Sequence, residues 1–162
     1  MLMKRVFSIL YILVSLLFLG YLLMPSPAFP EPPDEFVQSK EPADVETPLR
    51  RGYFTNLTRQ EIVEHYRREF TWGLRLNYPP EEAQTLIRDQ TKSTFLEEIV
   101  HPFRESLYVN GYEPKEGENA VGTGGVTFKQ KVIVKYVPSS YFVRISLGVA
   151  SLGLIWLIYR LL

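Results

Sequence analysis

Two long uncharged runs lie at the two ends of the chain and limit its possible folds more than any other feature. The first run, residues 6–24, contains 19 residues and no charged side chain. At 1.5 Å per residue, a helix of this length is about 28 Å long, close to the roughly 30 Å hydrocarbon core of a bilayer. The sequence therefore predicts a transmembrane helix over residues 6–24.

The second run lies between Arg144 and Arg160 and contains 15 uncharged residues. This length is short for a span, but residues 141–143 extend it, and both arginines can direct their charged ends toward lipid head groups. Aromatic side chains occur near both ends of the run, as is typical of the membrane interface. We therefore expect a second transmembrane helix over 141–160. The alternative, a buried helix of a soluble domain, fits poorly because no face of the run is polar.

The charges around the first run predict its orientation. Lys4 and Arg5 precede the run and acidic residues follow it, so the positive-inside rule places its N-terminus in the cytoplasm. We expect a two-span protein of the cell (plasma) membrane, with a cytoplasmic tail of residues 1–5, both termini in the cytoplasm, no cytoplasmic domain, and residues 25–140 outside. The alternative is a cleaved signal peptide over residues 1–28, although the apolar core is longer than the usual ~7–15 residues.

Residues 25–48 have the composition of a stalk. They contain seven of the chain's twelve prolines, and six acidic residues against one lysine. Such a segment lacks the apolar side chains of a core, and proline favours extended polyproline II structure. We expect a spacer between the membrane and an outer domain; the alternative is a ligand that presents a proline motif.

The remaining middle part, residues 49–138, is expected to form a small extracytoplasmic α+β domain. Its predicted fold is about three helices on a two- or three-stranded sheet, flanked by the N- and C-terminal transmembrane helices. Thr58 and Glu61 form the ends of a capping box, which predicts a helix over 58–70. Residues 72–78 read as a short strand, and the two prolines and two acids that follow suit the first turn of a second helix.

The segment that begins at residue 94 fits two patterns. Its apolar residues fit one face of a helix, but Pro102 would interrupt that helix at a cost of about 3 kcal/mol. We favour a strand over 95–101 and a helix over 102–110, ended by Gly111 in the left-handed conformation. One continuous helix is the alternative.

The last part of the outer domain combines a loop and a strand. Residues 113–125 are rich in glycine and predict a flexible loop, whereas residues 126–137 alternate apolar and polar side chains and predict a strand. Its polar side is a lysine face made of Lys129, Lys131 and Lys135. We expect this face near the outer leaflet, where it could meet anionic lipid or an acidic partner. The alternative is a solvated face that blocks edge pairing.

Two groups of polar residues are candidate sites. The first is a polar cluster consisting of Glu97, Glu98, His101 and Arg104. The second is a metal site that combines the chain's two histidines with glutamates three or four residues away: Glu61, His65, Glu98 and His101. Carboxylates and imidazoles can bind one divalent ion. If residues 95–101 form a strand, however, the second pair points to opposite faces. Ordinary ion pairs are the alternative for both groups.

Small side chains recur on one face of the second apolar run. Ser146, Ala150 and Gly153 are spaced at i, i+4 and i+7, which permits close approach of another helix. The first partner to expect is the chain's own first span, near Ser8 and Ser15. The alternative is that these small residues have no specific packing role.

Composition and motifs restrict the possible functions. The chain has no cysteine, which excludes disulfides, thiolate catalysis and cysteine metal sites. Its basic residues are matched by acids, so we expect no nucleic-acid partner, and no nucleophilic triad or phosphate loop occurs.

We expect a non-catalytic, membrane-anchored envelope protein without a cofactor. Its outer domain would be an interaction or assembly module, with the lipid bilayer and another membrane or envelope protein as partners. The alternatives are a metal-dependent membrane-bound enzyme that uses His65, His101 and nearby glutamates, and a sensor or regulatory subunit that couples through contacts of its transmembrane helices.

Overall fold

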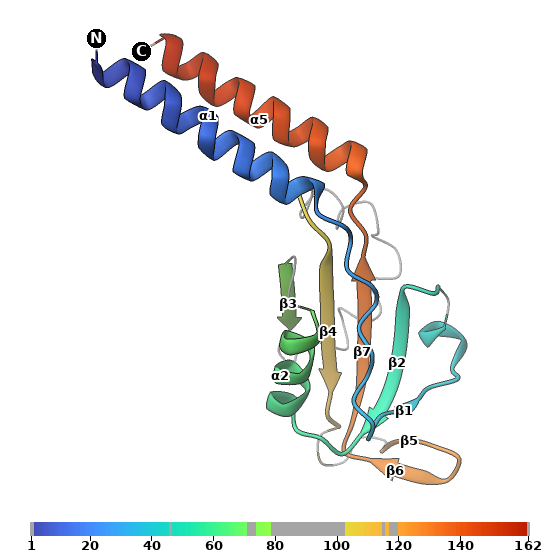
Figure 1. Ribbon diagram of the computed structural model, residues 1–162. Helices are drawn as coiled ribbons and strands as arrows, with labels where there is room; N and C mark the ends of the chain where they lie inside the picture. The colour runs from blue at the N-terminus through green and yellow to red at the C-terminus, as the bar shows by residue number, and fades with distance from the viewer. Residues whose placement is uncertain are drawn as a thin grey trace.

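The computed structural model describes residues 2–45, 47–70, 74–78, 103–114, 116 and 120–161 (Figure 1). The elements are α1 (Leu2–Leu23), β1 (Val37–Gln38), η1 (Pro42–Asp44), β2 (Arg50–Thr55), α2 (Arg59–Glu69), β3 (Leu74–Tyr78), β4 (Ser106–Tyr112), β5 (Val121–Thr123), β6 (Val126–Phe128), β7 (Gln130–Val137) and α5 (Tyr141–Leu161). The chain is therefore a mixed α+β protein. We call the part between the two terminal helices the head.

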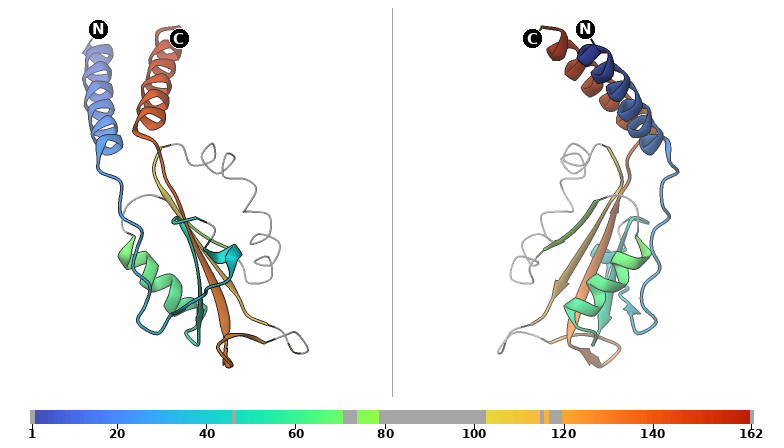
Figure 2. Two further views of the ribbon diagram at one scale, coloured as in Figure 1. Left: turned by 90° about the vertical axis from the view of Figure 1, so that its right-hand side faces the viewer. Right: turned by 60° about the vertical axis from the view of Figure 1, so that its left-hand side comes forward.

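The two terminal helices lie side by side and run in opposite directions, so both chain ends lie at the far end of the pair from the head (Figures 1 and 2). Both contain segments long and apolar enough to cross a membrane, Lys4–Leu23 and Tyr141–Leu161. Most of their large apolar side chains are exposed, which is how side chains that face lipid would lie. The pair fits the expected two-span architecture.

The head is built on a five-stranded sheet of order β1-β2-β7-β4-β3. β7 pairs antiparallel with β2 on one side and with β4 on the other, and β3 lies parallel to β4. The expected sheet of two or three strands was therefore too small. Because β7 lies between β2 and β4, its lysines do not block an edge of the sheet, as the alternative interpretation had it. β3 agrees with the strand expected over 72–78.

The expected helix over 102–110 was wrong, because these residues lead into strand β4. Leu107 and Val109 belong to the hydrophobic core, whereas Tyr108 and Asn110 are buried on the opposite face of the sheet. This alternation has the period of two that defines a strand. The strand expected over 95–101 and the helix expected after Tyr78 lie outside the described residues.

Gly111, predicted to end a helix, lies instead in β4 opposite Val132. Its φ is not positive, so it is not a left-handed cap. The reason for glycine is space: a Cβ there would lie 2.7 Å from Oε1 of Gln130, which donates from Nε2 to the carbonyl of Leu57. Gly111 therefore allows close approach of a side chain that ties β7 to the segment before α2.

α2 confirms the helix expected over 58–70. Thr58 Oγ1 accepts from the backbone N–H of Glu61, and the Glu61 carboxylate accepts from the backbone N–H of Thr58 at 2.7 Å. Hydrogen bonds from Thr58 hold the pKa of Glu61 below its usual value. Among the described residues, α2 is the one α-helix of the head; η1 is a single 3₁₀ turn.

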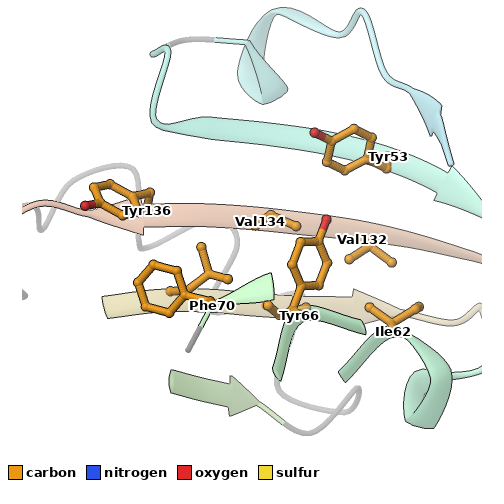
Figure 3. Close-up of a cluster of buried hydrophobic side chains, with 9 residues drawn as sticks. Tyr53, Ile62, Tyr66, Phe70, Val132, Val134 and Tyr136 are labelled. Carbon is orange, nitrogen blue, oxygen red and sulfur yellow. The ribbon is translucent and has the colours of Figure 1, made fainter. Parts of the chain in front are cut away.

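The core lies between α2 and one face of the sheet (Figure 3). Its buried members are Tyr53, Ile62, Tyr66, Phe70, Leu107, Val109, Val132, Val134 and Tyr136. The β7 residues at even positions thus point toward α2, as the alternation in the sequence predicted. The registers Tyr53↔Val132 and Val109↔Val134 place the β2 and β4 members on the same face.

The loop expected over 113–125 contains half of a β-hairpin. β5 pairs antiparallel with β6, and the turn between them consists of Gly124 and Gly125, at φ +59° and +79°. A two-residue hairpin turn with positive φ at both positions favours glycine. The strand expected over 126–137 is divided at Lys129 into β6 and β7. The hairpin lies at the end of the head farthest from the paired helices (Figure 1).

Residues 25–48 are not the free spacer that their composition predicted. β1 pairs with β2, and Phe29 and Phe36 pack against the core. Further along, η1 places the buried Asp44 against Gly52 of β2, where a Cβ would lie 2.5 Å from the Asp44 carboxyl carbon. We call residues 25–36, which lie on the α2 side of the sheet, the strap.

Candidate functional site: a buried charged junction beneath the paired helices

Three charged side chains meet where the paired helices join the head. Arg104 and Glu105 directly precede β4, and Arg144 lies in the first turn of α5. Their side chains are 3%, 0% and 0% exposed, respectively. Charged side chains are rarely buried so completely unless they are paired. We call these three residues the junction.

Glu105 is the centre of the junction. Its Oε1 accepts a hydrogen bond from Arg144 Nη1 at 2.9 Å and another from the Ser26 hydroxyl at 2.5 Å. Its Oε2 lies 3.0 Å from Arg104 Nε, in an ion pair that is not an aligned hydrogen bond. One carboxylate therefore holds together the start of β4, the start of the strap and the start of α5.

Arg104 binds the end of α1. Its guanidinium donates to the backbone carbonyls of Tyr21 at 3.2 Å, Met24 at 3.0 Å and Pro25 at 3.1 Å. Carbonyls at the C-terminal end of a helix have no partner within the helix and carry a partial negative charge, so a cation there is favourable. Arg104 thus ends α1 and ties that end to β4.

Arg144 closes the junction from the side of α5. Besides Glu105, it donates from Nη2 to the Met24 carbonyl at 3.3 Å, and its guanidinium lies 4.0 Å from the centre of the Tyr141 ring. The expectation that Arg144 reaches toward lipid head groups was therefore wrong, because a buried carboxylate within the protein holds it. Arg160 differs: it is exposed and lies over Trp156, as an interfacial residue can.

The charges of the junction do not cancel by themselves. Two guanidiniums face one carboxylate, which leaves one positive charge, and the end of α1 offsets about half a charge. The directional bonds of the junction fix α1, α5 and β4 relative to one another.

Tyr136 extends this polar region into the core. Its hydroxyl donates to the Pro27 carbonyl at 2.9 Å. Burial, with a further contribution from the negative charge of Glu105, raises the pKa of Tyr136 to about 12. The folded protein therefore holds the phenol proton more tightly than the unfolded chain does, whose tyrosines ionise near pH ~10.

We expect this proton to make the stability fall at alkaline pH. Since the folded-state pKa is the higher one, the stabilisation is complete below pH ~10 and is lost as the pH rises to about 12, at most about 1.4 kcal/mol per pH unit. Urea titrations between pH 8 and 12 would measure the slope. Tyr136→Phe should flatten it; an unchanged slope in that variant would contradict the assignment. Burial also raises the pKa of Tyr66, so some slope should remain.

Of the predicted polar cluster, the structure describes Arg104 alone, and its partners are Glu105 and the end of α1. Glu97, Glu98 and His101 lie outside the described residues. The cluster as predicted therefore stays untested.

Two members of the predicted metal site are described, and each has another partner. Glu61 belongs to the capping box of α2, and His65 Nε2 lies 2.9 Å from the carbonyl oxygen of Glu31. Within the described ranges, no three side chains of the types that bind metals gather in one place. The other two members, Glu98 and His101, lie outside those ranges.

The lysine face lies in a different place from the one expected. Lys131 Nζ is 2.7 Å from Glu41 and 2.8 Å from Asp44, in ion pairs that attach the η1 segment to the sheet. Lys129 is 3.5 Å from Glu113. Both lysines lie at the hairpin end of β7, away from α5, whereas the sequence analysis expected the lysine face near the membrane. Lys135, nearer to α5, is half-buried.

The small residues Ser146, Ala150 and Gly153 of α5 are exposed, and Gly153 also lines the groove between α5 and α1. Gly148 is buried in the contact with α1, where a Cβ would lie 2.5 Å from Leu22, and the Tyr11 hydroxyl donates to the Leu152 carbonyl. On α1, Ser15 and Tyr11 line the groove between the two helices. Packing of the small-residue face on another protein stays a prediction.

Glu105 and Arg144 are the site residues that the sequence analysis did not select. Their pairing joins positions 39 residues apart and no local pattern predicts it. One signal was available: a charged residue inside an apolar span usually faces protein or water rather than lipid. Arg144 is such a residue.

Comparison with protein-family models, with curated proteins and with solved structures finds no match to this chain. The paired helices, the head and the junction are therefore the features that bear on function.

Proposed function

We propose that this protein is a two-span membrane protein of the cell envelope whose head is a non-catalytic interaction or assembly module. The observation that carries this proposal is the junction. It joins both candidate spans to the sheet through bonds of Arg104 and Arg144 to one buried carboxylate. A head held in one orientation relative to two spans can present a surface to a neighbouring protein at a set place. The orientation proposed is that of the sequence analysis, with Lys4 and Arg5 in the cytoplasm and the head outside.

A sensor or regulatory subunit is a second candidate, which the same junction favours. Arg104 binds the end of α1 and Arg144 belongs to α5, and both contact Glu105. A sliding movement of one helix along the other would pull on the carboxylate and on β4. Head contacts could then report helix contacts within the membrane.

Single-cysteine variants offer the direct test, because the chain has no native cysteine. Thr127→Cys places a thiol on the exposed β6, and Lys4→Cys places one at the other end of the molecule. In intact cells, a membrane-impermeant maleimide should label position 127 and not position 4. The opposite pattern would overturn the proposed orientation.

The interaction itself is tested by cross-linking in native membranes. A photoreactive cross-linker attached at position 127 or elsewhere on the head should capture a partner in near-stoichiometric yield, whereas the same reagent on the lipid-facing Phe142→Cys should capture lipid. A clean monomer after cross-linking from several head positions would argue against an assembly module.

A further inference from the structure

The strap has an unusually restricted backbone. Five of its residues between positions 25 and 33 are prolines, whose ring fixes φ near −65°. Ser26, Phe29 and Glu31 each precede a proline and are therefore biased toward extended geometry. Ala28 alone among residues 25–33 is free of both restrictions. The strap is thus prepared for the polyproline II conformation before it contacts anything.

The burial of the strap follows the period of that conformation. Pro30 and Pro33 are buried and Pro27 is half-buried, whereas Ala28 and Glu31 are exposed. Polyproline II has three residues per turn, so residues three apart lie on one side. One proline face of the strap therefore points into the head.

Aromatic side chains of the head receive this segment. The Phe29 ring lies 6.3 Å from the Tyr136 ring, between ring centres. The Arg51 guanidinium lies 4.2 Å from the centre of the Phe29 ring. The Phe36 ring lies 5.1 Å from Tyr53 and 6.4 Å from the α2 residue Tyr66. Figures 1 and 2 show the strap running along the sheet on the side that carries α2.

Polar groups of the head meet the strap's carbonyls. The Tyr136 hydroxyl donates to the Pro27 carbonyl at 2.9 Å, and His65 Nε2 lies 2.9 Å from the Glu31 carbonyl oxygen. Carbonyls in polyproline II have no hydrogen bonds within the segment, so those of Pro27 and Glu31 are free to be bound in this way. At its end the strap turns, and the Pro33 carbonyl accepts from the backbone N–H of Phe36 at 3.0 Å. An aromatic-lined surface with donors for backbone carbonyls is the general means by which proteins bind proline-rich peptides.

We propose that this surface, which we call the proline groove, is a recognition site for polyproline II peptides that the protein fills with its own strap. The groove is formed by side chains of α2, β2 and β7: Arg51, Tyr53, His65, Tyr66 and Tyr136. A proline-rich segment of a partner, with prolines three residues apart and an aromatic residue three positions after the last, binds there by displacing the strap. This deepens the proposed function by naming the class of partner, and it rests on that function for the existence of one.

The strap is joined covalently to the head, and this connection determines how strongly a separate peptide can bind to the proline groove. A short linker gives its own segment an effective concentration in the millimolar range, so the strap competes strongly with any peptide in solution. Weakening the strap by substitution should therefore reveal the affinity of the groove. We expect a peptide to bind the weakened protein at least about tenfold more tightly than the native one.

The test uses the full chain in detergent micelles. The strap is weakened by Phe29→Ser together with Pro30→Ser and Pro33→Ser, and the probe is a fluorescent peptide of residues 25–38 measured by anisotropy. The expected result is saturable binding to the variant, at least tenfold weaker binding to the native chain, and recovery of the variant's Tm with added peptide. A control peptide with alanine at the positions of Pro27, Pro30 and Pro33 should bind at least tenfold more weakly. Equal binding of both peptides, or none to a variant whose circular dichroism is native, would overturn the inference.

A second measurement covers the case in which this variant does not fold. The native strap can be locked by a bis-maleimide between Phe29→Cys and Arg51→Cys, since these side chains touch and the chain has no other thiol. At millimolar peptide, the unlocked double variant should bind and the locked one should not. Binding that is equal in both, or absent from both, would overturn the inference. A captured native partner that lacks a proline-rich segment would also overturn it, while leaving the proposed function supported.

Discussion

Replacing Glu105 by alanine is expected to lower the free energy of unfolding by about 3–5 kcal/mol, the largest effect of any single substitution in the junction. The change removes the one carboxylate and leaves the guanidiniums of Arg104 and Arg144 buried without a counter-charge. Arg104 keeps its carbonyl partners at the end of α1, whereas the partners that Arg144 keeps among the described residues are the Met24 carbonyl and the Tyr141 ring. Urea titration of the protein in detergent micelles, followed by circular dichroism of the head, measures the loss.

Two further variants separate the junction from charge in general. Glu113→Ala removes a carboxylate whose ion pair with Lys129 is nearly half exposed on both sides, so it should cost less than about 1 kcal/mol. Adding Arg144→Met to Glu105→Ala should recover part of the loss, because it removes a buried charge and keeps an apolar side chain of similar length. If Glu105→Ala costs no more than Glu113→Ala, the junction does not hold the head to the helices.

The second large effect is expected at Phe70, the residue that follows the last turn of α2. Phe70→Ala should cost about 3–5 kcal/mol, the usual range for a buried aromatic residue, because the ring is fully buried and leaves a cavity beside Tyr136. Thermal and urea unfolding of the head measure this loss. Phe142→Ala is the matched control: its ring is 80% exposed on α5, so the head should keep its stability within about 0.5 kcal/mol. Equal effects of the two variants would contradict the assigned core.

The sequence predicted the elements whose signals are local. Both spans follow from the length of their uncharged runs, and α2 follows from the capping box of Thr58 and Glu61, whose two hydrogen bonds are both present. The core side of β7 follows from its alternation. In α2 and β7, the residues that carry the sequence signal also make the contacts that hold the element in place.

The sequence misled where a neighbouring element decides the conformation. Around β4, Phe103 and Leu107 have helical spacing and Gly111 has the place of a helix cap, yet β7 pairs with every residue of β4 from Ser106 to Tyr112. The lack of a side chain at Gly111 leaves room for the Gln130 side chain. Strand residues depend on cross-strand partners more than on their own preference, and a single sequence does not show which strand lies beside which.

The prediction of a free spacer, made from composition, was wrong for the strap for a related reason. Proline and acid content predicts a segment that buries little, and most of residues 25–48 are polar or proline. Two phenylalanines, Phe29 and Phe36, nevertheless pack on aromatic side chains of the head, and bonds to the Pro27 and Glu31 carbonyls add to the attachment. Likewise, the junction depends on a contact between Glu105 and Arg144 that forms only once the fold has brought β4 and α5 together.

The length of β7 sets a dimension of the whole molecule. Its eight residues extend for about 27 Å, from the base of the β5–β6 hairpin to a point three residues before α5. The strand therefore sets the distance between the hairpin and the paired helices, which lie at its two ends (Figure 1). Two residues more or fewer in β7 would change this distance by about 7 Å.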